Sequence, residues 1–222
     1  MFTSGRILEI KTMLTLYYAP NTCSLASHLA LEHAGAKYEV AKVNFAINEQ
    51  RSFAYLQVNP KGRVPALATE RGVLTETPAM LLFIAQTHPE SELAPIEDPF
   101  KLAQMNAFNS YLCSTVHVAH AHRMRGNRWA DEPAAWDAMK RKVPQSVGDA
   151  FAIVESELLN GQWVLGERIS TCDFYLLTLA RWLEADGVDV SRLPRVVEHR
   201  ARMLARPLVR RIIEQEESPP PV

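Results

Sequence analysis

The fold is decided by residues 14–45, which have the sequence LTLYYAPNTCSLASHLALEHAGAKYEVAKVNF. The short apolar and aromatic run Leu14–Ala19 ends at a Pro-Asn pair, which predicts a buried strand. Ser24–Ala34 carries apolar residues at helical spacing and is followed by Gly35, so we expect a helix that ends there. Tyr38–Phe45 alternates around its two valines, which predicts a second strand. A strand, a helix and a strand within about thirty residues predict a crossover unit with parallel strands.

The residues that follow predict two more strands and a helix. Two short apolar runs, Val64–Ala68 and Gly72–Leu74, are joined by a charged turn, which predicts a pair of strands. Thr77 is a suitable N-cap for the next helix, and Pro78 then takes the first helical position, where a missing N–H breaks no hydrogen bond. One short helix is also expected near residues 51–57.

After this α/β pattern the chain changes to helices alone. Residues 88–99 contain three prolines and four acidic residues with little apolar periodicity, which favours a linker. Helices are expected over residues 98–124, 133–159, 170–185, 193–205 and 208–216.

The chain is therefore divided into five parts. We expect a poorly ordered extension over residues 1–12, an α/β domain over 13–88, a linker over 89–97, an all-helical domain over 98–217 and a tail over 218–222. With 222 residues, of which 47% are apolar, the chain can bury one large core or two small ones.

Charge and cysteine content exclude several classes of protein. The chain has 24 basic and 25 acidic residues, so it lacks the positive surface that attracts nucleic acids or membranes, and we expect neither partner. Thr12–Leu31 and Leu102–His122 contain no charged residue, but their polar content favours buried elements over membrane spans. Three widely spaced cysteines form neither a disulfide framework nor a zinc pattern, and no secretory signal is evident, so we expect a cytoplasmic protein.

Four motifs occur in the order and spacing of a known family. They are LYYAPNTCS at residues 16–24, NPKGRVP at 59–65, TETPA at 75–79 and GERISTCD at 166–173. In this combination the chain resembles the cytosolic glutathione transferases, and most of all the bacterial beta class, over about residues 13–215. The resemblance implies a thioredoxin-like first domain, a helical-bundle second domain, glutathione as co-substrate without a prosthetic group, and a homodimer.

Cys23 lies where the first strand should turn into the first helix. Free backbone N–H groups and the helix dipole at such a position stabilise a thiolate, which predicts a lowered pKa. A cysteine beside an apolar helix can equally be a small core residue. The resemblance implies that Cys23 is the active-site cysteine, which either donates a hydrogen bond to the glutathione sulfur or forms a mixed disulfide with it. The neighbouring Ser24 hydroxyl is a second candidate donor to that sulfur.

The two middle motifs are expected to bind glutathione. Val64-Pro65 resembles the family's cis-proline dipeptide, whose backbone pairs with the cysteinyl part of glutathione like an added strand; the alternative is an ordinary turn proline. Thr77 at a helix start suits the γ-glutamyl carboxylate, and Glu76 suits the ammonium group. A capping role for Thr77 is compatible with this binding role.

A histidine-rich segment lies on the expected long helix. His117 and His120 share a face while His122 points elsewhere, and no acidic residue or cysteine follows at helical spacing, so we expect no metal site. The resemblance implies that His117 approaches the sulfur from the helical domain; the alternative is a buried histidine with a satisfied partner. The chain departs from the family at Val118, where a lysine is common, and at Arg63, where an aromatic residue is common. Candidates to replace the lysine, unless they only form a solvated face, are Arg123, Arg125 and Arg128.

The remaining candidates are expected to be structural. Other classes of the family use a tyrosine on the first strand, but for Tyr18 strand packing is the expected role. Ser170 and Asp173 should form an N-capping box without a chemical role. Cys113 and Cys172 lie within expected helices and should be inert.

The expected function is activation of the glutathione thiolate for conjugation to small hydrophobic electrophiles, as in detoxification. One alternative is a glutathione-dependent thiol–disulfide reductase or isomerase on the same scaffold. Another is a non-catalytic protein that binds apolar ligands, although an intact Glu76-Thr77 pair disfavours loss of the glutathione site.

Overall fold

The computed structural model describes residues 13–218. The expected extension over residues 1–12 and residues 219–222 of the expected tail lie outside the described part. Within that part, no helix is both long enough and apolar enough to cross a membrane.

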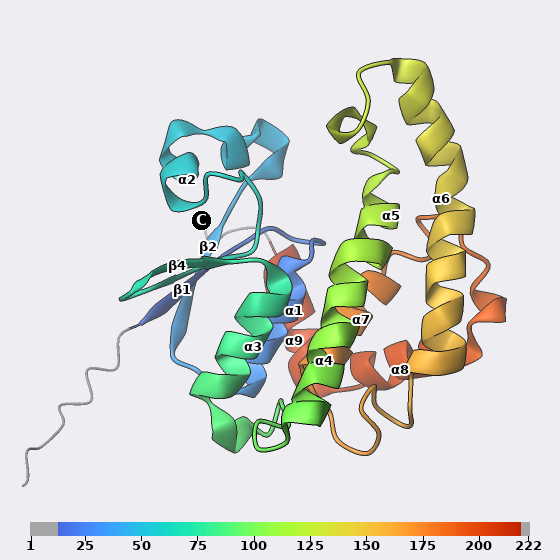
Figure 1. Cartoon of the computed structure of the whole chain (residues 1–222). Helices are drawn as coiled ribbons and strands as arrows, with labels where there is room; N and C mark the ends of the chain where they lie inside the picture. The colour runs from blue at the N-terminus through green and yellow to red at the C-terminus, as the bar shows by residue number, and fades with distance from the viewer. Residues whose placement is uncertain (1–12, 219–222) are drawn as a thin grey trace, which may run out of the picture.

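The first domain is built on one four-stranded sheet with the strand order β2-β1-β3-β4. Its strands are β1 (Leu14–Tyr18), β2 (Tyr38–Lys42), β3 (Ala66–Thr69) and β4 (Gly72–Thr75). β1 and β2 are parallel, which confirms the expected crossover, whereas β3 is antiparallel to both β1 and β4. Helices α1 (Ser24–His33) and α3 (Thr77–Thr87) cover one face of the sheet, and the short α2 (Phe53–Val58) lies on the other (Figure 1).

The second domain consists of helices that lie beside α1 and α3 (Figure 1). These helices are α4 (Pro99–Tyr111), α5 (His117–Ala121), α6 (Pro133–Ile153), α7 (Thr171–Ala180), α8 (Pro194–Leu204) and α9 (Pro207–Glu217). The expected fold class, a thioredoxin-like α/β domain followed by a helical one, is thereby confirmed.

Two elements end earlier than the sequence predicts. β2 stops at Lys42 because the next residues turn away: the Asn44 side chain accepts a hydrogen bond from the backbone N–H of Ala46 and starts a 3₁₀ turn. The regular part of α7 stops at Ala180, and the chain continues in turns that close at Gly187, whose φ of 77° suits a left-handed helix stop.

The start of α3 also differs from the expectation. Glu76, not Thr77, is the N-cap, so Thr77 and Pro78 are the first two helical residues. Glu76 has a φ of 70°, a value that residues other than glycine rarely adopt. Such backbone strain is often found at functional sites. Here the positive φ of Glu76 lets the chain pass from β4 directly into α3.

The expected long helix after residue 98 contains a local irregularity. The Asp98 carboxylate accepts hydrogen bonds from the backbone N–H groups of Phe100 and Lys101, which caps α4 as expected. A π-helical turn over Leu112–Val116 then joins α4 to α5. Such turns insert one extra residue, rotate the side chains that follow, and often lie beside functional sites.

The two domains share one apolar core. Buried side chains of the sheet and of α1, among them Leu16 and Leu29, belong to the same cluster as Phe174 of α7, and α1 packs directly against α7. A second, smaller cluster consists of Ala19, Val43, Tyr55 and Val64. Since most of the core is common to both domains, the position of each domain relative to the other is fixed by packing.

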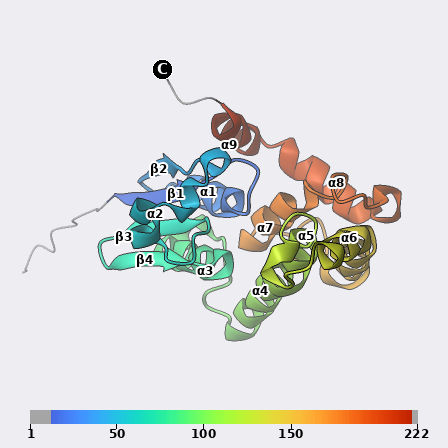
Figure 2. The same cartoon turned by 90° about the horizontal axis from the view of Figure 1, so that it is seen from above.

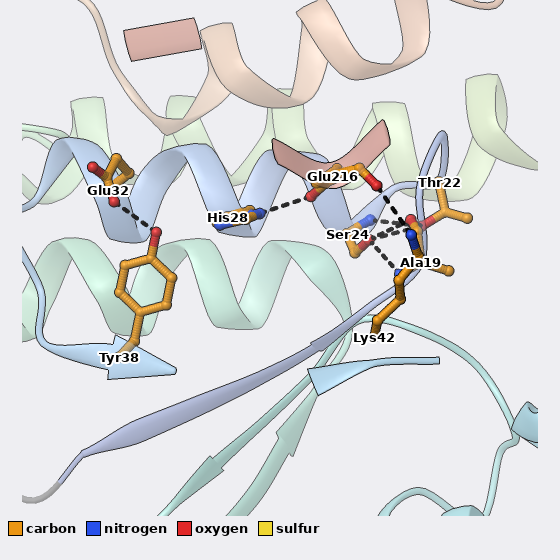
Figure 3. A network of polar contacts seen from close by, with 8 residues as sticks. All are labelled: Ala19, Thr22, Ser24, His28, Glu32, Tyr38, Lys42 and Glu216. Atoms are coloured by element: carbon orange, nitrogen blue, oxygen red, sulfur yellow. Dashed lines mark hydrogen bonds and ion pairs between the residues drawn. The ribbon is translucent and has the colours of Figure 1, made fainter. Parts of the chain in front are cut away.

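The last helix returns to the first domain, where α9 lies against α1 (Figure 2). The imidazole Nδ1 of His28 is 2.8 Å from Oε1 of Glu216, and both side chains are buried (Figure 3). Lys42 Nζ donates to the backbone oxygens of Glu216 at 3.5 Å and of Ser218 at 3.2 Å. Burial raises the pKa of Glu216, and the neighbouring His28 opposes this shift.

Candidate active site

A cleft with a volume of about 640 Å³ lies between the two domains. This volume is within the range usual for sites that bind small molecules. One wall comes from the first domain: the β1–α1 loop, the loop before β3 and the start of α3. The other wall comes from α5, the loop after it, and α7. The expected residues that the cleft brings together are Cys23, Val64, Pro65, Glu76, Thr77 and His117.

Cys23 is the N-cap of α1 and is 9% exposed. Its thiol donates to the backbone oxygen of Val64 across 3.4 Å. The expected lowering of its pKa is wrong: burial raises the pKa of Cys23 to about 12, and a hydrogen bond with the Thr77 side chain only partly opposes this. Desolvation of the charged form therefore outweighs the hydrogen bonds that favour the thiolate, and Cys23 is a neutral thiol near pH 7.

Ser24 does not face the cleft, contrary to the expectation. It is fully buried, and its hydroxyl donates to the backbone oxygen of Ala19 at 3.1 Å (Figure 3). The Thr22 hydroxyl lies 2.8 Å from the same Ser24 oxygen. These bonds hold the β1–α1 loop in shape and leave the Ser24 hydroxyl no access to a ligand in the cleft.

The loop before β3 carries the expected cis peptide bond between Val64 and Pro65. The backbone oxygen of Arg63 accepts hydrogen bonds from the Tyr55 hydroxyl and the Asn59 side-chain amide, each at 2.7 Å. Gly62 has a φ of 59°, and a Cβ at this position would lie 2.8 Å from the backbone oxygen of Gln50. The loop is thus held rigidly, with the Val64 oxygen directed at Cys23.

Glu76 and Thr77 lie at the N-terminus of α3, at the edge of the cleft. Thr77 is buried, whereas the Glu76 carboxylate is 52% exposed and pairs with Lys61 Nζ at 2.6 Å. Lys61 also donates to the Thr75 hydroxyl at 2.9 Å. An acid, a base and a helix N-terminus side by side can bind both charges of an α-amino acid head group.

The helical wall is organised around Trp182. The imidazole of His120 stacks on the Trp182 ring, with centroids 4.1 Å apart, and the His117 ring centroid lies 5.5 Å from the same ring. Trp182 Nε1 donates to Asn21 Oδ1 at 3.1 Å and so joins this wall to the β1–α1 loop beside Cys23. The buried carboxylate of Asp186 lies 2.7 Å from His120 Nδ1 and orients that ring.

His117 lines the cleft from the first turn of α5. Burial lowers the pKa of its imidazole to about 4, and His120 and nearby arginines act in the same direction. His117 is therefore neutral near pH 7, with one ring nitrogen as a donor and the other as an acceptor. It can form a hydrogen bond in the cleft, but it brings no positive charge.

Two further groups line the floor of the cleft. Cys113 lies in the π-helical turn, faces the cleft, and has a pKa that burial raises. Tyr175 is fully buried, and within the described chain its hydroxyl has no hydrogen-bond partner. By contrast, Tyr18 packs against His28 at 5.7 Å, and Cys172 is fully buried with its thiol directed at a backbone oxygen of α4, so neither lines the cleft.

Ser170 and Asp173 lie at the start of α7, away from the cleft. The Ser170 backbone N–H donates to Asp173 Oδ2 at 2.7 Å. Asp173 Oδ1 accepts from the backbone N–H of Val164 at 2.8 Å and lies 2.9 Å from His199 Nε2. One buried carboxylate therefore joins α7, α8 and the loop between α6 and α7.

Comparison with known proteins identifies the family. The family described as "Glutathione S-transferase, N-terminal domain" matches residues 12–86, and "Glutathione S-transferase, C-terminal domain" matches residues 129–207. The crystal structure of a glutathione transferase homologue from Sulfitobacter, with bound glutathione, is 43% identical, with a TM-score of 0.88; the match covers 91% of this chain and 98% of that chain. The chain belongs to the glutathione S-transferase family.

Two other glutathione transferases are similar over nearly their whole length. The beta-class enzyme of Sphingomonas chungbukensis is 31% identical with a TM-score of 0.79, and the match covers 91% of this chain and 98% of that one. The transferase GstA of Escherichia coli O157:H7 is 28% identical over 204 residues, which are 90% of this chain and 98% of the relative.

Several residues that line this glutathione transferase's cleft, or that hold its lining residues in place, were not identified from the sequence. Lys61 pairs with Glu76 at the edge of the cleft, and no motif or periodicity in the sequence marks a lysine as the partner of a particular acidic residue. Trp182, Asp186 and Tyr175 lie on α7 or just after it, where apolar periodicity indicates only a buried helix. The indole N–H of Trp182 and the carboxylate of Asp186 were the available signals of a polar contact, because such groups need a partner when they are buried.

Proposed function

We propose that this glutathione transferase binds glutathione in the cleft with its sulfur beside Cys23 and transfers it to an electrophile held against the helical wall. The observation that carries the proposal is the convergence of three groups on one wall: the Cys23 thiol, the backbone of Val64 and the Glu76-Thr77 pair. They would serve, respectively, the thiol, the cysteinyl backbone and the γ-glutamyl head group of glutathione.

The peptide would be bound mainly by the first domain. The N-terminus of α3 and the Thr77 hydroxyl accommodate the γ-glutamyl carboxylate, and Glu76 pairs with the ammonium group. The backbone of Val64, next to Pro65, pairs with the cysteinyl residue as an added strand would. Lys61, already paired with Glu76, fixes the carboxylate in place.

Cys23 would act as a neutral donor, not as a nucleophile. A thiol with a pKa of about 12 is protonated near neutral pH, so it can donate a hydrogen bond to the glutathione thiolate in place of the Val64 oxygen. The neutral imidazole of His117 would offer a second hydrogen bond from the opposite wall. Both bonds strengthen as the sulfur loses its proton, and this differential stabilisation lowers the pKa of glutathione.

Ser170 and Asp173 are proposed to be structural. Their hydrogen bonds cap α7, and α7 carries Tyr175 in the floor of the cleft. For the domain boundaries we propose residues 13–88 and 98–217, a division supported by the change from the sheet to helices alone after α3.

We also propose a homodimer of the beta class that detoxifies electrophiles in the cytoplasm. Large exposed apolar side chains on both domains support a dimer in which the first domain of one subunit meets the helical domain of the other; they include Phe53, Val73 and Phe100. Three free cysteines support a reducing compartment. Sedimentation analysis would test the dimer, and a monomer at micromolar concentration would contradict it.

Titration calorimetry with glutathione tests the proposed function first. We expect binding at millimolar glutathione or below, and conjugation of 1-chloro-2,4-dinitrobenzene faster than reduction of a mixed glutathione disulfide. Faster reduction would favour the reductase alternative, in which Cys23 is a nucleophile. Binding of apolar ligands without any turnover would favour the non-catalytic alternative.

A further inference from the structure

The cleft carries a cluster of positive charge contributed by both domains. Arg51 and Arg63 come from the segments on either side of α2, whereas Arg125 and Arg128 come from the loop after α5. All four side chains line the cleft and are exposed, so a ligand can reach them. We refer to these four residues as the arginine cluster.

No acidic group neutralises the arginine cluster within residues 13–218. None of its four members has a carboxylate within 4.0 Å there, whereas the neighbouring Arg123 is paired with Asp186 at 3.3 Å. Among the described residues that line the cleft, the only carboxylate is that of Glu76, and Lys61 is already paired with it. Partial burial, together with the charges of the other three arginines, lowers the pKa of Arg128, so Arg128 lies close enough to the other three for their charges to act on it.

Glutathione leaves part of this charge unmatched. Its γ-glutamyl carboxylate is assigned to the start of α3, which leaves the glycine carboxylate and the thiolate as its remaining anionic groups. If each is paired with one guanidinium, two of the four arginines still have no anionic partner. Four like charges held together without counterions raise the free energy of the empty cleft, and an anionic ligand relieves this.

Apolar surface lies directly beside the cluster. Trp129, which follows Arg128, is 44% exposed, and Met124, which precedes Arg125, is 72% exposed; both line the cleft. An aromatic ring can stack on such a side chain while an attached carboxylate meets a guanidinium in a paired hydrogen bond.

We propose that the second substrate is an organic anion: an aromatic or alkyl electrophile that carries a carboxylate, sulfonate or similar group. This deepens the proposed function and rests on it. For an electrophile of this class with a halogen as leaving group, the glutathione thiolate forms a C–S bond to the electrophilic carbon in the transfer step, and the C–halogen bond breaks. The halide leaves with its electron pair, and the thiol proton has already passed to solvent.

A matched pair of electrophiles tests the proposal. The probes are 4-chloro-3,5-dinitrobenzoate and its methyl ester, which share one ring and one leaving group and differ in charge. For each probe, kcat/KM is divided by the rate of its uncatalysed reaction with glutathione. We expect the acid to exceed the ester by about tenfold or more, with the preference declining as salt is added.

Variants locate the effect in the cluster. Arg128→Gln and Arg63→Gln should each reduce the ratio of acid to ester by about tenfold, the loss expected for one charged hydrogen bond. Arg71→Gln is the matched control, because Arg71 is an exposed arginine in the β3–β4 turn and does not line the cleft. We expect this control to keep the ratio of the unchanged protein.

The outcomes separate this inference from the proposed function. Equal use of both probes, a preference for the ester, or variants that reduce acid and ester alike would overturn the anionic substrate alone. Lack of turnover with both probes and with 1-chloro-2,4-dinitrobenzene would overturn the transferase activity, and the inference with it.

Discussion

The two walls of the cleft differ in the kinds of chemical group that they present to a ligand. The wall of the first domain presents backbone groups, a helix N-terminus and a buried thiol, and hydrogen bonds hold the loop around Val64 and the loop before α1 in place. The wall of the helical domain presents long side chains, several of them exposed, on α5 and the loop that follows it. A rigid wall suits glutathione, which is the same in every reaction. A wall of side chains suits the second substrate, which can differ between related proteins.

The largest effect is expected from removing the Asp173 carboxylate, which joins α7 to α8 and to the loop between α6 and α7. Asp173→Ala leaves the His199 ring and the Val164 N–H, both buried, without their acceptor, so the free energy of unfolding should fall by about 3–5 kcal/mol. Urea titration monitors the loss. Ser170→Ala at the same cap should cost only about 1 kcal/mol, and equal losses would contradict this account.

The next effect tests the wall of the first domain. Glu76→Gln removes the charge proposed to pair with the glutathione ammonium, so KM for glutathione should rise by about 10- to 100-fold with a smaller change in kcat. Glu70→Gln in the β3–β4 turn is the matched control, because Glu70 is exposed and does not line the cleft. An unchanged KM in Glu76→Gln would remove Glu76 from glutathione binding.

A third effect is the pH dependence of stability that His117, in the helical wall, should cause. The pKa of His117 is about 4 in the folded protein and about 6.5 in an unfolded chain, so the unfolded state binds the proton first as pH falls. The contribution of His117 to the free energy of unfolding is complete above about pH 6.5 and declines as pH falls towards about 4. Between pH 7 and pH 5 the free energy of unfolding should decrease by about 2 kcal/mol for this reason. His117→Asn should therefore lose less stability than the unchanged protein over this interval. Urea titrations at both pH values measure the difference, and parallel losses would contradict a neutral His117.

The smallest expected effect tests whether Cys23 acts as a hydrogen-bond donor or as a nucleophile. Cys23→Ser keeps a donor and should retain the conjugation rate within about threefold, whereas Cys23→Ala should reduce kcat by about tenfold and raise the pKa of bound glutathione. The ultraviolet absorbance of the thiolate, followed against pH, reports that pKa. If the serine variant were as slow as the alanine variant, Cys23 would have to act through its sulfur.

Sequence was a better guide to the first wall than to the second, and the physical reason is local. A strand end and a helix start are determined largely by neighbouring residues, so the turn at Cys23 and the helix that begins at Thr77 could be predicted, although its N-cap is Glu76. The ionisation of Cys23 could not, because it depends on burial by segments distant in the chain. The cluster of Arg51 with Arg128 was equally hidden, since two domains must pack before these side chains share a cleft.

The pairing of His28 with Glu216 has a consequence for synthesis on the ribosome. The two residues are 188 positions apart, so α1 is complete long before its buried imidazole has an acceptor. Until α9 emerges, that imidazole must remain hydrated, and the face of α1 that carries it stays uncovered. The nascent first domain therefore stays incomplete until Glu216 has been synthesised and can pack against α1.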